Sequence, residues 1–469
     1  MQSLWKSTVQ LPDKKQLMGN TKVENVVIGG GMAGILIAYF LKKAGQQVIV
    51  LEAGKIASGQ TKNTTAKITS QHGFIYYDMI QKAGKNRAQG YAAANEAAIQ
   101  SYEDIIKEEG VDCDFERLPA FLYSTEEMGR EQLQKEAAAA KSLGINAVFL
   151  EGDKIQELPF TVTGAVCFEN QAQFHPLKFI RHLSADLEIY ENTNVLSVKG
   201  KKLVTNKGFI VAENIIFATH YPFINVPGFY FLRQHQDRSY VLALEGENVP
   251  SKLNGMYYGI DKGGLSFRCA EGKMLLGGGS HRTGKKFCGC ENKERHAQNN
   301  DRIRTQEGYK YLREMAHQYY TGAKETTHWA AQDCMPHDKI PFIGRSSVMR
   351  PNWYVATGFQ KWGMTSSMIA AMIVSDLIVG RKNPYEKVFS PQRILFRAGI
   401  KDFCIDMGES VLSLTKGWLG KKEKRCRHMG CRLVWNEEEE SWDCPCHGSR
   451  FGKNGELIDN PAQKNMHGK

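Results

Sequence analysis

The chain has 469 residues, with 61 Lys and Arg against 50 Asp and Glu, and its formal net charge is +11. Hydrophobic residues make up 42% of the sequence and charged residues 24%, a balance that is typical of a globular protein and excludes collagen-like and disordered chains. Basic residues alternate with acidic ones along most of the chain, so we expect no nucleic-acid partner.

The apolar segments are too short for a membrane span. The run from Met368 to Val379 contains Ser375 and Asp376 and falls below the roughly 20 residues that a transmembrane helix needs. The N-terminal stretch lacks the apolar core of a secretory signal. We therefore expect no transmembrane segment, a cytoplasmic location, and one large two-part catalytic body with a small appendage.

Residues 23–52 predict a complete βαβ unit. The sequence VENVVIGGGMAGILIAYFLKKAGQQVIVLE places Gly29, Gly31 and Gly34 in a G-x-G-x-x-G pattern between a strand and a helix, and a second strand ends at Glu52. The glycines allow a tight turn, a close approach to a pyrophosphate and close helix packing, and the acid can bind an adenosine ribose. This unit predicts a dinucleotide site.

A late segment, residues 353–378, favours FAD over NAD as the dinucleotide. It reads as a short strand that leads through Gly358 and the turn Gly363-Met364-Thr365 into a helix. The dipole at the start of that helix can stabilise negative charge on a reduced flavin. NAD domains seldom need such a distant piece of chain.

These motifs resemble the D-amino-acid oxidase and glycine oxidase family of FAD-dependent oxidoreductases over about residues 20–390. The resemblance implies that IASGQTKNTTAKITSQHG (56–73) wraps the pyrophosphate and the flavin edge, and that Val195 in NTNVLSV meets the adenine. The expected FAD-binding residues are Gly29, Gly31, Gly34, Glu52, Thr64, Thr65, Ala66, Val195, Gly358, Gly363, Met364 and Thr365.

The same resemblance implies an α/β fold with a Rossmann-like FAD-binding domain and an α+β substrate domain. We expect the body to span residues 1–390, followed by a linker and a small all-β C-terminal module. The expected FAD-binding segments are about 20–75, 185–222 and 340–385, the substrate domain about 76–184 and 223–339, the linker 391–425 and the module 426–469.

Enzymes of this family oxidise a carbon–nitrogen bond by hydride transfer to the flavin, so no catalytic acid or base is required. Arg238 and Tyr240 are candidates to bind a substrate carboxylate, and His281 and His220 to tune the charge near it. Arg238 is alternatively a structural ion pair, and the two histidines loop or cap residues. Lys67 lies either near the flavin or at the sheet edge.

Two other groups of polar residues give only weak evidence for a functional site. Asp333, His337 and Asp338 are metal ligands by type, but a loop that enters a buried strand explains them as well. Cys288 and Cys290 form a C-x-C in a basic loop, which we interpret as a surface feature.

The tail contains two cysteine–histidine pairs, in CRHMGC (426–431) and CPCHGS (444–449). Two thiolates and two neutral imidazoles, from Cys426, His428, Cys444 and His447, can hold either a tetrahedral zinc ion or a [2Fe–2S] cluster. The ligand types alone leave both open.

The residues around these pairs resemble the Rieske proteins, specifically the cytochrome bc type. Cys431 and Cys446 occupy matching places in the two loops, and Ser449 follows the second. The resemblance implies that Cys426 and Cys444 bind one iron, that His428 and His447 bind the other, and that Cys431 and Cys446 form a disulfide.

The tail also departs from that family in two respects. Phe451 stands where high-potential members have a tyrosine, so we expect fewer hydrogen bonds to the sulfurs and an intermediate potential. Only residues 413–425 separate the body from Cys426, which predicts an abbreviated sheet. Either the body shields the cluster loops, or the cluster is exposed and labile.

An FAD body with a Rieske tail resembles a bacterial oxidoreductase architecture. It implies a dehydrogenase that oxidises a small amine or amino acid at FAD and passes electrons through the cluster to an external carrier; the reverse direction is equally compatible. One alternative is a non-catalytic electron-transfer or redox-sensing flavoprotein. Another is a flavoprotein whose zinc-binding tail holds nucleic acid through the basic residues 421–425.

Overall fold

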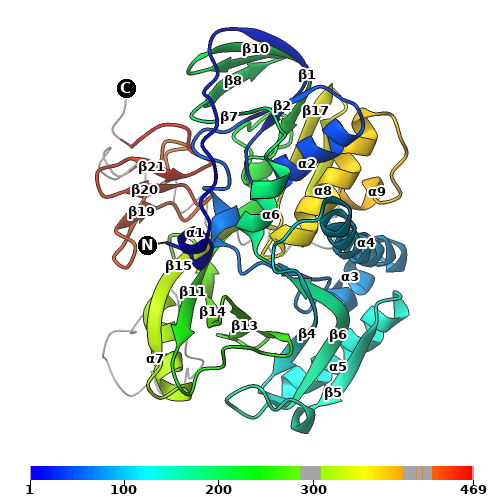
Figure 1. The fold of residues 1–469 in the computed structure, drawn as a ribbon, viewed down its shortest axis with the longest axis vertical. Coiled ribbons are helices and arrows are strands. Elements are labelled where there is room, and N and C mark those ends of the chain that lie inside the picture. Colours follow the sequence, from blue (N-terminus) through cyan, green and yellow to red (C-terminus); the bar gives the residue numbers. More distant parts are fainter. Residues whose placement is uncertain (1, 286–307, 394–407, 409–414, 416–424, 467–469) are drawn as a thin grey trace.

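The computed structural model describes residues 2–285, 308–393, 408, 415 and 425–466 (Figure 1). The predicted C-x-C loop at Cys288 and most of the basic cluster before Cys426 lie outside these residues. The described chain forms two large sheets and one small sheet, with helices packed mainly against the large ones.

The first sheet has eight strands and contains the predicted βαβ unit. Strands β10, β1 and β2 run parallel at its centre, in the register Asn25 opposite Asn214 and Val48. Buried on both faces, parallel strands consist of nearly continuous apolar residues, as in VIVL of β2. The path is β16 (Phe342–Ser347), β17 (Arg350–Thr357), β10 (Gly208–Phe217), β1 (Thr21–Ile28), β2 (Val48–Leu51) and β7 (Ile189–Tyr190), with β8 (Val195–Lys199) and β9 (Lys202–Thr205) beside β10.

Two apolar helices, α2 (Met32–Lys43) and α8 (Gly363–Ile378), pack together against the first sheet. The apolar run that begins at Met368 lies in α8, which is buried along almost its whole length. Within the described parts of the chain, no helix has the length and apolar character needed to cross a membrane.

The second sheet has nine strands and stands below the first in Figure 1. Its longest pair, β11 and β15, is antiparallel, and β11 also pairs with β14. The strands are β15 (Lys324–Pro336), β11 (Gln234–Glu245), β14 (Lys273–Arg282), β13 (Ser266–Ala270), β12 (Met256–Gly259), β4 (Glu116–Ser124), β6 (Gly164–Gln173), β3 (Lys67–Ile68) and β5 (Ala147–Glu151).

The remaining helices cover the two sheets. Helix α7 packs on β11 and β14, α5 packs on β4, β5 and β6, and α9 packs on β16. The bounds are α1 (Leu4–Thr8), α3 (Tyr76–Ala83), α4 (Lys85–Glu109), α5 (Glu127–Ser142), α6 (Pro176–Leu183), α7 (Gly308–Tyr319) and α9 (Glu386–Phe389), with short 3₁₀ turns η1 (Gln60–Asn63), η2 (Gly152–Lys154) and η3 (Tyr230–Leu232).

The packing assigns three elements differently from the expected domain segments. Helices α4 and α6 fall in the segment expected for the substrate domain, yet α4 packs on α8 and α6 on α2. Strand β3 falls in the expected FAD-binding segment, but it pairs with β6 of the second sheet. The chain therefore crosses between the two sheets more often than the expected segments imply.

The third sheet forms the C-terminal module, which lies beside the junction of the two large sheets (Figure 1). Its four antiparallel strands are β18 (Val434–Asn436), β19 (Ser441–Asp443), β20 (Arg450–Gly452) and β21 (Leu457–Asp459). Each has three residues, so the sheet is as abbreviated as the sequence predicts.

Close backbone contact at the start of α2 makes Gly34 irreplaceable. A Cβ on Gly34 would lie 1.9 Å from the Gly29 carbonyl oxygen, whereas a Cβ on Gly31 would meet only the Thr61 hydroxyl, at 3.2 Å. We predict that Gly34→Ala lowers the free energy of unfolding by at least about 2 kcal/mol, because rigid backbone must move. Urea unfolding with Gly31→Ala as the matched variant checks this. Equal stability of the two variants would contradict it.

Candidate functional site

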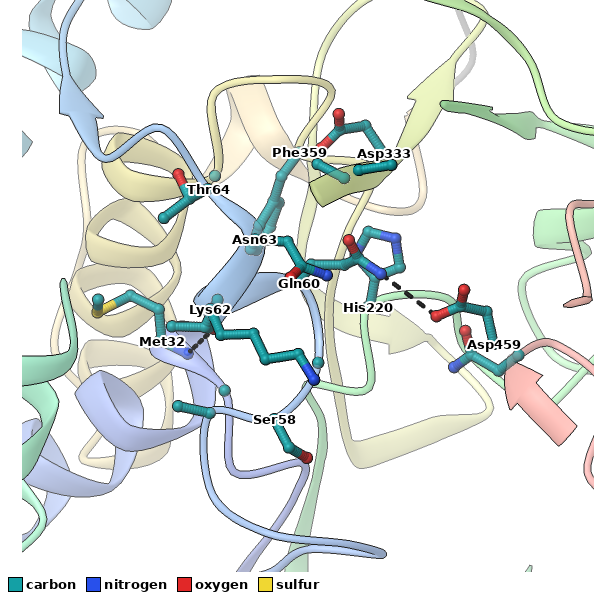
Figure 2. Close-up of a pocket in the computed structure, with 18 of the residues that line it drawn as sticks. Met32, Ser58, Gln60, Lys62, Asn63, Thr64, His220, Asp333, Phe359 and Asp459 are labelled. Carbon is teal, nitrogen blue, oxygen red and sulfur yellow. Dashed lines mark hydrogen bonds between the residues drawn. The ribbon is translucent and has the colours of Figure 1, made fainter. Parts of the chain in front are cut away.

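A cavity of about 830 Å³ lies where the first sheet, the second sheet and the C-terminal module meet. The glycine turn after β1, the segment 57–65 and the start of α8 contribute to its wall. The second sheet adds residues of β11, β13, β14 and β15, and the C-terminal module adds residues 457–460. Figure 2 shows Lys62, His220, Asp333 and Asp459 around this space. All three parts of the chain therefore share one cavity.

The end of the cavity at α2 has the features of a dinucleotide site. The first turn of α2 opens into the cavity at Gly31, Met32 and Ala33, where backbone N–H groups and the helix dipole favour a pyrophosphate. Met32 N–H donates to Thr61 Oγ1 at 2.9 Å (Figure 2). Glu52 accepts the N–H groups of Gly30 and Gly54, each at 2.8 Å, and burial raises the pKa of its carboxyl.

Two tryptophans and one arginine donate hydrogen bonds to the backbone carbonyls of residues 63–65 and hold this segment in place. Trp5 Nε1 donates to the Thr64 carbonyl at 2.7 Å, Trp329 Nε1 donates to the Asn63 carbonyl at 2.9 Å, and Arg268 donates to the Thr65 carbonyl. The Thr64 and Thr65 side of this segment faces the cavity, so the N-terminal helix and the second sheet together shape the wall.

The predicted FAD-binding residues divide into two groups. Some of them pack against other parts of the protein and do not line the cavity. Gly358 lies so close to Pro336 that a Cβ on it would be 2.5 Å from Pro336 Cγ, and the Thr365 hydroxyl donates to the Thr69 carbonyl at 3.3 Å. Gly34 and Ala66 also lie behind the wall. The residues that line the cavity are Gly29, Gly31, Glu52, Thr64, Thr65, Val195, Gly363 and Met364.

The structure gives Arg238 a partner other than a substrate. Its buried guanidinium pairs with Glu439 of the C-terminal module, and Asp459 lies 3.9 Å away. The alternative of a structural ion pair is therefore the arrangement observed. Tyr240 lines the cavity, but His281 stacks behind it, with ring centroids 5.6 Å apart, and does not reach the wall.

Three charged residues that the sequence did not single out as a group face the cavity or lie against it. Lys361 and Asp333 line it, and Asp237 lies opposite Asp333 in the β11–β15 register. Burial raises the pKa of Asp333 to about 7. Burial alone would lower the pKa of Lys361, but Tyr258 and the two aspartates raise it. No sequence motif indicates this cluster, because its members come from three separate segments.

The possible metal triad at 333–338 does not form. Asp338 binds Arg393, with Nε–Oδ2 and Nη2–Oδ1 distances of 2.8 and 2.9 Å, while Asp333 faces the cavity. Asp333 and Asp338 therefore lie in different environments although they are close in the sequence, so their spacing does not indicate a metal site.

Lys67 lies inside the protein and not at a solvated sheet edge. Its Nζ donates to the Tyr257 carbonyl at 2.9 Å and to Ser266 Oγ at 2.7 Å, and the side chain lines the cavity. Burial, followed by the nearby Arg268 charge, lowers its pKa to about 7.

The two cysteine–histidine loops of the C-terminal module have matching backbone geometry. Gly430 N–H donates to the Cys426 carbonyl and Gly448 N–H to the Cys444 carbonyl, each at 2.9 Å. Both glycines have positive φ, +88° and +83°, a conformation that glycine adopts without strain. The two loops therefore present their first cysteines in equivalent ways.

The imidazoles of His428 and His447 face each other as a ligand pair would. Their Nδ1 atoms are 3.3 Å apart, the separation expected for two nitrogens about 2.0–2.1 Å from one tetrahedral metal ion. Their Nε2 atoms contact Asn225 Oδ1 at 3.0 Å and the Phe231 carbonyl at 3.1 Å. Burial lowers both pKa values to about 4, so both rings are neutral, as metal ligation requires.

The thiols complete a donor set that fits a [2Fe–2S] cluster. A hydrogen bond with Cys444 lowers the pKa of Cys426, and Ser449 also contacts that thiol. Thiolate formation is what cluster binding requires. Phe451 is fully buried behind the loops, without the phenol that a tyrosine would bring.

The predicted disulfide between Cys431 and Cys446 is absent. Among the described residues, no two cysteines lie at disulfide distance. The sulfurs of Cys431, Cys444 and Cys446 lie within 4.8 Å of one another, but the pair is not at the roughly 2.05 Å separation of a disulfide. Proximity in three dimensions was correctly predicted, while the covalent bond was not.

The body shields the second ligand loop of the C-terminal module, although the module's own sheet is short. Gln236 Nε2 donates to the His447 carbonyl and Gln332 Nε2 to the Gly448 carbonyl, both at 2.7 Å. Arg282 donates to the carbonyls of Pro445 and Cys446 at 2.8 and 2.9 Å. The second sheet thus supplies a layer that the module's own small sheet does not provide.

Comparison with known proteins agrees with both halves of the site. The family model of FAD dependent oxidoreductases (DAO) matches residues 25–377, and that of the Rieske [2Fe-2S] domain matches residues 406–468. A protein of Bacillus subtilis (strain 168) that carries the name Rieske 2Fe-2S iron-sulfur protein YhfW is 34% identical over 514 residues, which cover 99% of this chain and 96% of that protein.

Solved structures show the same fold for the body. L-proline dehydrogenase from P. horikoshii has a TM-score of 0.62 at 18% identity and covers 80% of this chain and 98% of its own. Glycine oxidase from Geobacillus kaustophilus has a TM-score of 0.61 at 19% identity, with coverage of 80% and 99%. The cofactors that the two domains imply are FAD and a [2Fe–2S] cluster. This chain belongs to the DAO family of FAD-dependent oxidoreductases and carries a C-terminal Rieske [2Fe–2S] domain.

Proposed function

We propose that this protein is a dehydrogenase that oxidises the carbon–nitrogen bond of a small amine or amino acid, and that the electrons leave through the Rieske cluster to an external carrier. Bound FAD supplies the hydride acceptor. The substrate loses a hydride and a proton and becomes an imine. The observation that carries this proposal is that residues 457–460 of the Rieske module form part of the FAD cavity wall.

A chain of glutamine amides, two of them buried and Gln60 half-buried, supports a direct connection between the two cofactor sites. Gln60, on the cavity wall, accepts the Gln332 N–H at 2.8 Å and donates to Asp459 Oδ1 at 3.3 Å (Figure 2). Gln332 Nε2 donates to Gln236 Oε1 at 2.9 Å as well as to Gly448. Since Gln236 binds the His447 carbonyl, hydrogen bonds link the cavity to a predicted cluster ligand.

This arrangement favours a dehydrogenase over an enzyme that uses oxygen as its electron acceptor. The cavity wall that the body shares with the Rieske module supports this choice, because a cluster in the module would be an electron acceptor within the same molecule. His428 is half-buried and contacts Asn225, and the residues that follow these two in the sequence, Met429 and Val226, have exposed side chains, so a carrier could approach the cluster on this side.

The first prediction concerns turnover. Under anaerobic conditions, one member of an amine and amino-acid library should bleach the flavin absorption and produce a reduced-Rieske EPR signal, because both centres receive electrons from the same substrate. Stopped-flow absorption and freeze-quench EPR measure the two events. If no amine reduces the flavin at any concentration, the protein is a non-catalytic electron carrier or sensor instead.

A second prediction concerns the metal centre. Cys444→Ser should reduce iron and acid-labile sulfide to background without loss of FAD, because a serine hydroxyl remains protonated and does not replace the thiolate. Cys113→Ser, which alters a buried thiol of the body core, is the matched variant and should keep the cluster. One zinc ion and no sulfide in the native protein would overturn the cluster assignment.

A third prediction tests the amide chain. Gln332→Leu should slow the appearance of the EPR signal but leave the rate of flavin bleaching unchanged, because it removes the bonds to Gly448 and Gln236. Gln171→Leu is the matched variant, since Gln171 is equally buried but binds Ser70 far from the module. Equal cluster reduction rates in both variants would rule out a role for this chain.

A further inference from the structure

A turn of the flavoprotein body, residues 225–231, covers the histidine side of the cluster loops. Asn225 Oδ1 contacts His428 Nε2 at 3.0 Å, and the Phe231 carbonyl contacts His447 Nε2 at 3.1 Å. The ring of Phe231 also lies edge-on against the His447 ring, with the centroids 6.1 Å apart. Both predicted histidine ligands of the cluster therefore meet the body at this turn.

The turn is anchored in the body and has a defined shape. The N–H of Phe229 donates to the Asn225 carbonyl at 3.0 Å and closes the turn. Tyr230 is buried in the core beside the first sheet, and Arg233 donates to the Pro391 carbonyl at 2.7 Å. A surface that is already ordered loses little conformational entropy when a partner binds to it.

Phe229 has two features that packing inside the protein does not explain. Its φ is +49°, a left-handed conformation that is rare for a bulky residue. Its side chain is 48% exposed, although burial of a phenylalanine is favourable. A strained backbone and an exposed aromatic ring at the same position indicate a surface that makes a functional contact.

Phe229 belongs to an apolar patch that also contains Val226, Phe231 and Met429. Val226 is 61% exposed and Met429 is 36% exposed, and the rings of Phe229 and Phe231 lie 6.2 Å apart. Val226 follows Asn225 in the chain, and Met429 follows His428. The patch therefore surrounds the point at which the body touches a predicted cluster ligand.

The chain segments that form the patch carry positive charge. Residues 222–236 and 425–436 contain four arginines and no aspartate or glutamate. Two of these arginines, Arg427 and Arg432, are exposed, and the formal net charge of the whole chain is +11. Such a surface attracts an acidic protein from a distance and raises the rate of encounter.

Two other occupants fit this patch less well. A lipid surface usually binds an amphipathic helix with a long apolar face, whereas the patch consists of a turn and a ligand loop. A second copy of the chain in a two-fold dimer would bring the same arginines face to face. A small apolar centre with a charged rim is typical of transient redox complexes.

We propose that an acidic electron-transfer protein docks on residues 225–231 of the body, with Phe229 at the centre of the contact and Arg427 and Arg432 at its rim. One electron passes from the reduced cluster to the oxidised centre of the bound carrier, so a two-electron oxidation needs two such encounters. The inference rests on the proposed exit of electrons through the Rieske cluster, and it adds the docking surface and the kind of carrier.

Stopped-flow mixing with two acceptors of opposite charge tests this proposal. The full-length protein is reduced with dithionite, freed of excess reductant and mixed with oxidised plastocyanin, which is acidic, or with oxidised cytochrome c, which is basic. Plastocyanin should be reduced at least about tenfold faster at low salt. This preference should disappear between about 0.01 M and about 1 M salt, because the Debye length falls from about 30 Å to about 3 Å.

Variants of the patch separate the two parts of the contact. Arg427→Glu with Arg432→Glu should remove the preference for plastocyanin at low salt. Phe229→Asn, whose new residue tolerates the left-handed backbone, should slow plastocyanin reduction at high salt as well, because it removes apolar contact. Met349→Asn and Arg350→Glu, at exposed positions of the β16–β17 turn, are the matched variants and should behave as the native protein. Iron content identifies any variant that has lost the cluster, and Arg432→Glu alone then replaces the double variant.

The proposal is wrong if the native protein reduces the two acceptors at equal rates, or if the patch variants change these rates no more than the matched variants do. Binding to phosphatidylglycerol vesicles that Phe229→Asn abolishes, without any preference between the acceptors, would identify a lipid surface instead. Since dithionite supplies the electrons, a charge preference that depends on the patch supports the docking surface even if no amine reduces the flavin.

Discussion

The buried ion pair between Arg238 and Glu439 holds the two halves of this protein in one body. Arg238 belongs to β11, and Glu439 follows β18 of the Rieske module. Arg450 joins the same network through Glu439 at 3.2 Å, Asp443 at 3.0 Å and Asp459 at 3.1 Å. Of these pairs, those of Arg238 with Glu439 and, at 3.9 Å, with Asp459 cross from the body to the module, and removing one partner of such a buried pair typically costs about 3–5 kcal/mol. The module is therefore an integral part of the enzyme and not a loosely tethered carrier.

That fixed position explains how such a small module can hold a cluster. Four strands of three residues cannot bury both ligand loops by themselves, and Gln236, Gln332 and Arg282 of the body take over the role of a covering layer. The same side chains bring the ligand loop next to the FAD cavity. Stability of the module and proximity of the two redox centres thus have the same structural cause.

The cavity also shows why charged residues must be judged by their partners. Arg238 has the residue type expected of a carboxylate-binding group, but its charge is neutralised by the module. Lys67 has a less conspicuous sequence context, yet it lines the cavity and its two hydrogen-bond acceptors, the Tyr257 carbonyl and Ser266 Oγ, are neutral. Residue type alone is therefore no basis for assigning a cation to an anionic ligand, because its pairing within the protein must be known as well.

The sequence by itself determined the local features of both cofactor sites. The glycine turn with Glu52, the two cysteine–histidine pairs and the helix at Gly363 depend on short stretches whose backbone conformation and donor types are set by neighbouring residues, and all of them occur as predicted. The fold class followed from the same motifs.

Only the tertiary structure decided which distant residues meet. The pairing of Arg238 with Glu439, the cluster of Lys361 with Asp333 and the cover over His447 all depend on contacts between segments far apart in the chain. Side-chain charge and hydrogen-bonding capacity are properties of single residues, but burial and the choice of partner arise only when the sheets and the module pack together.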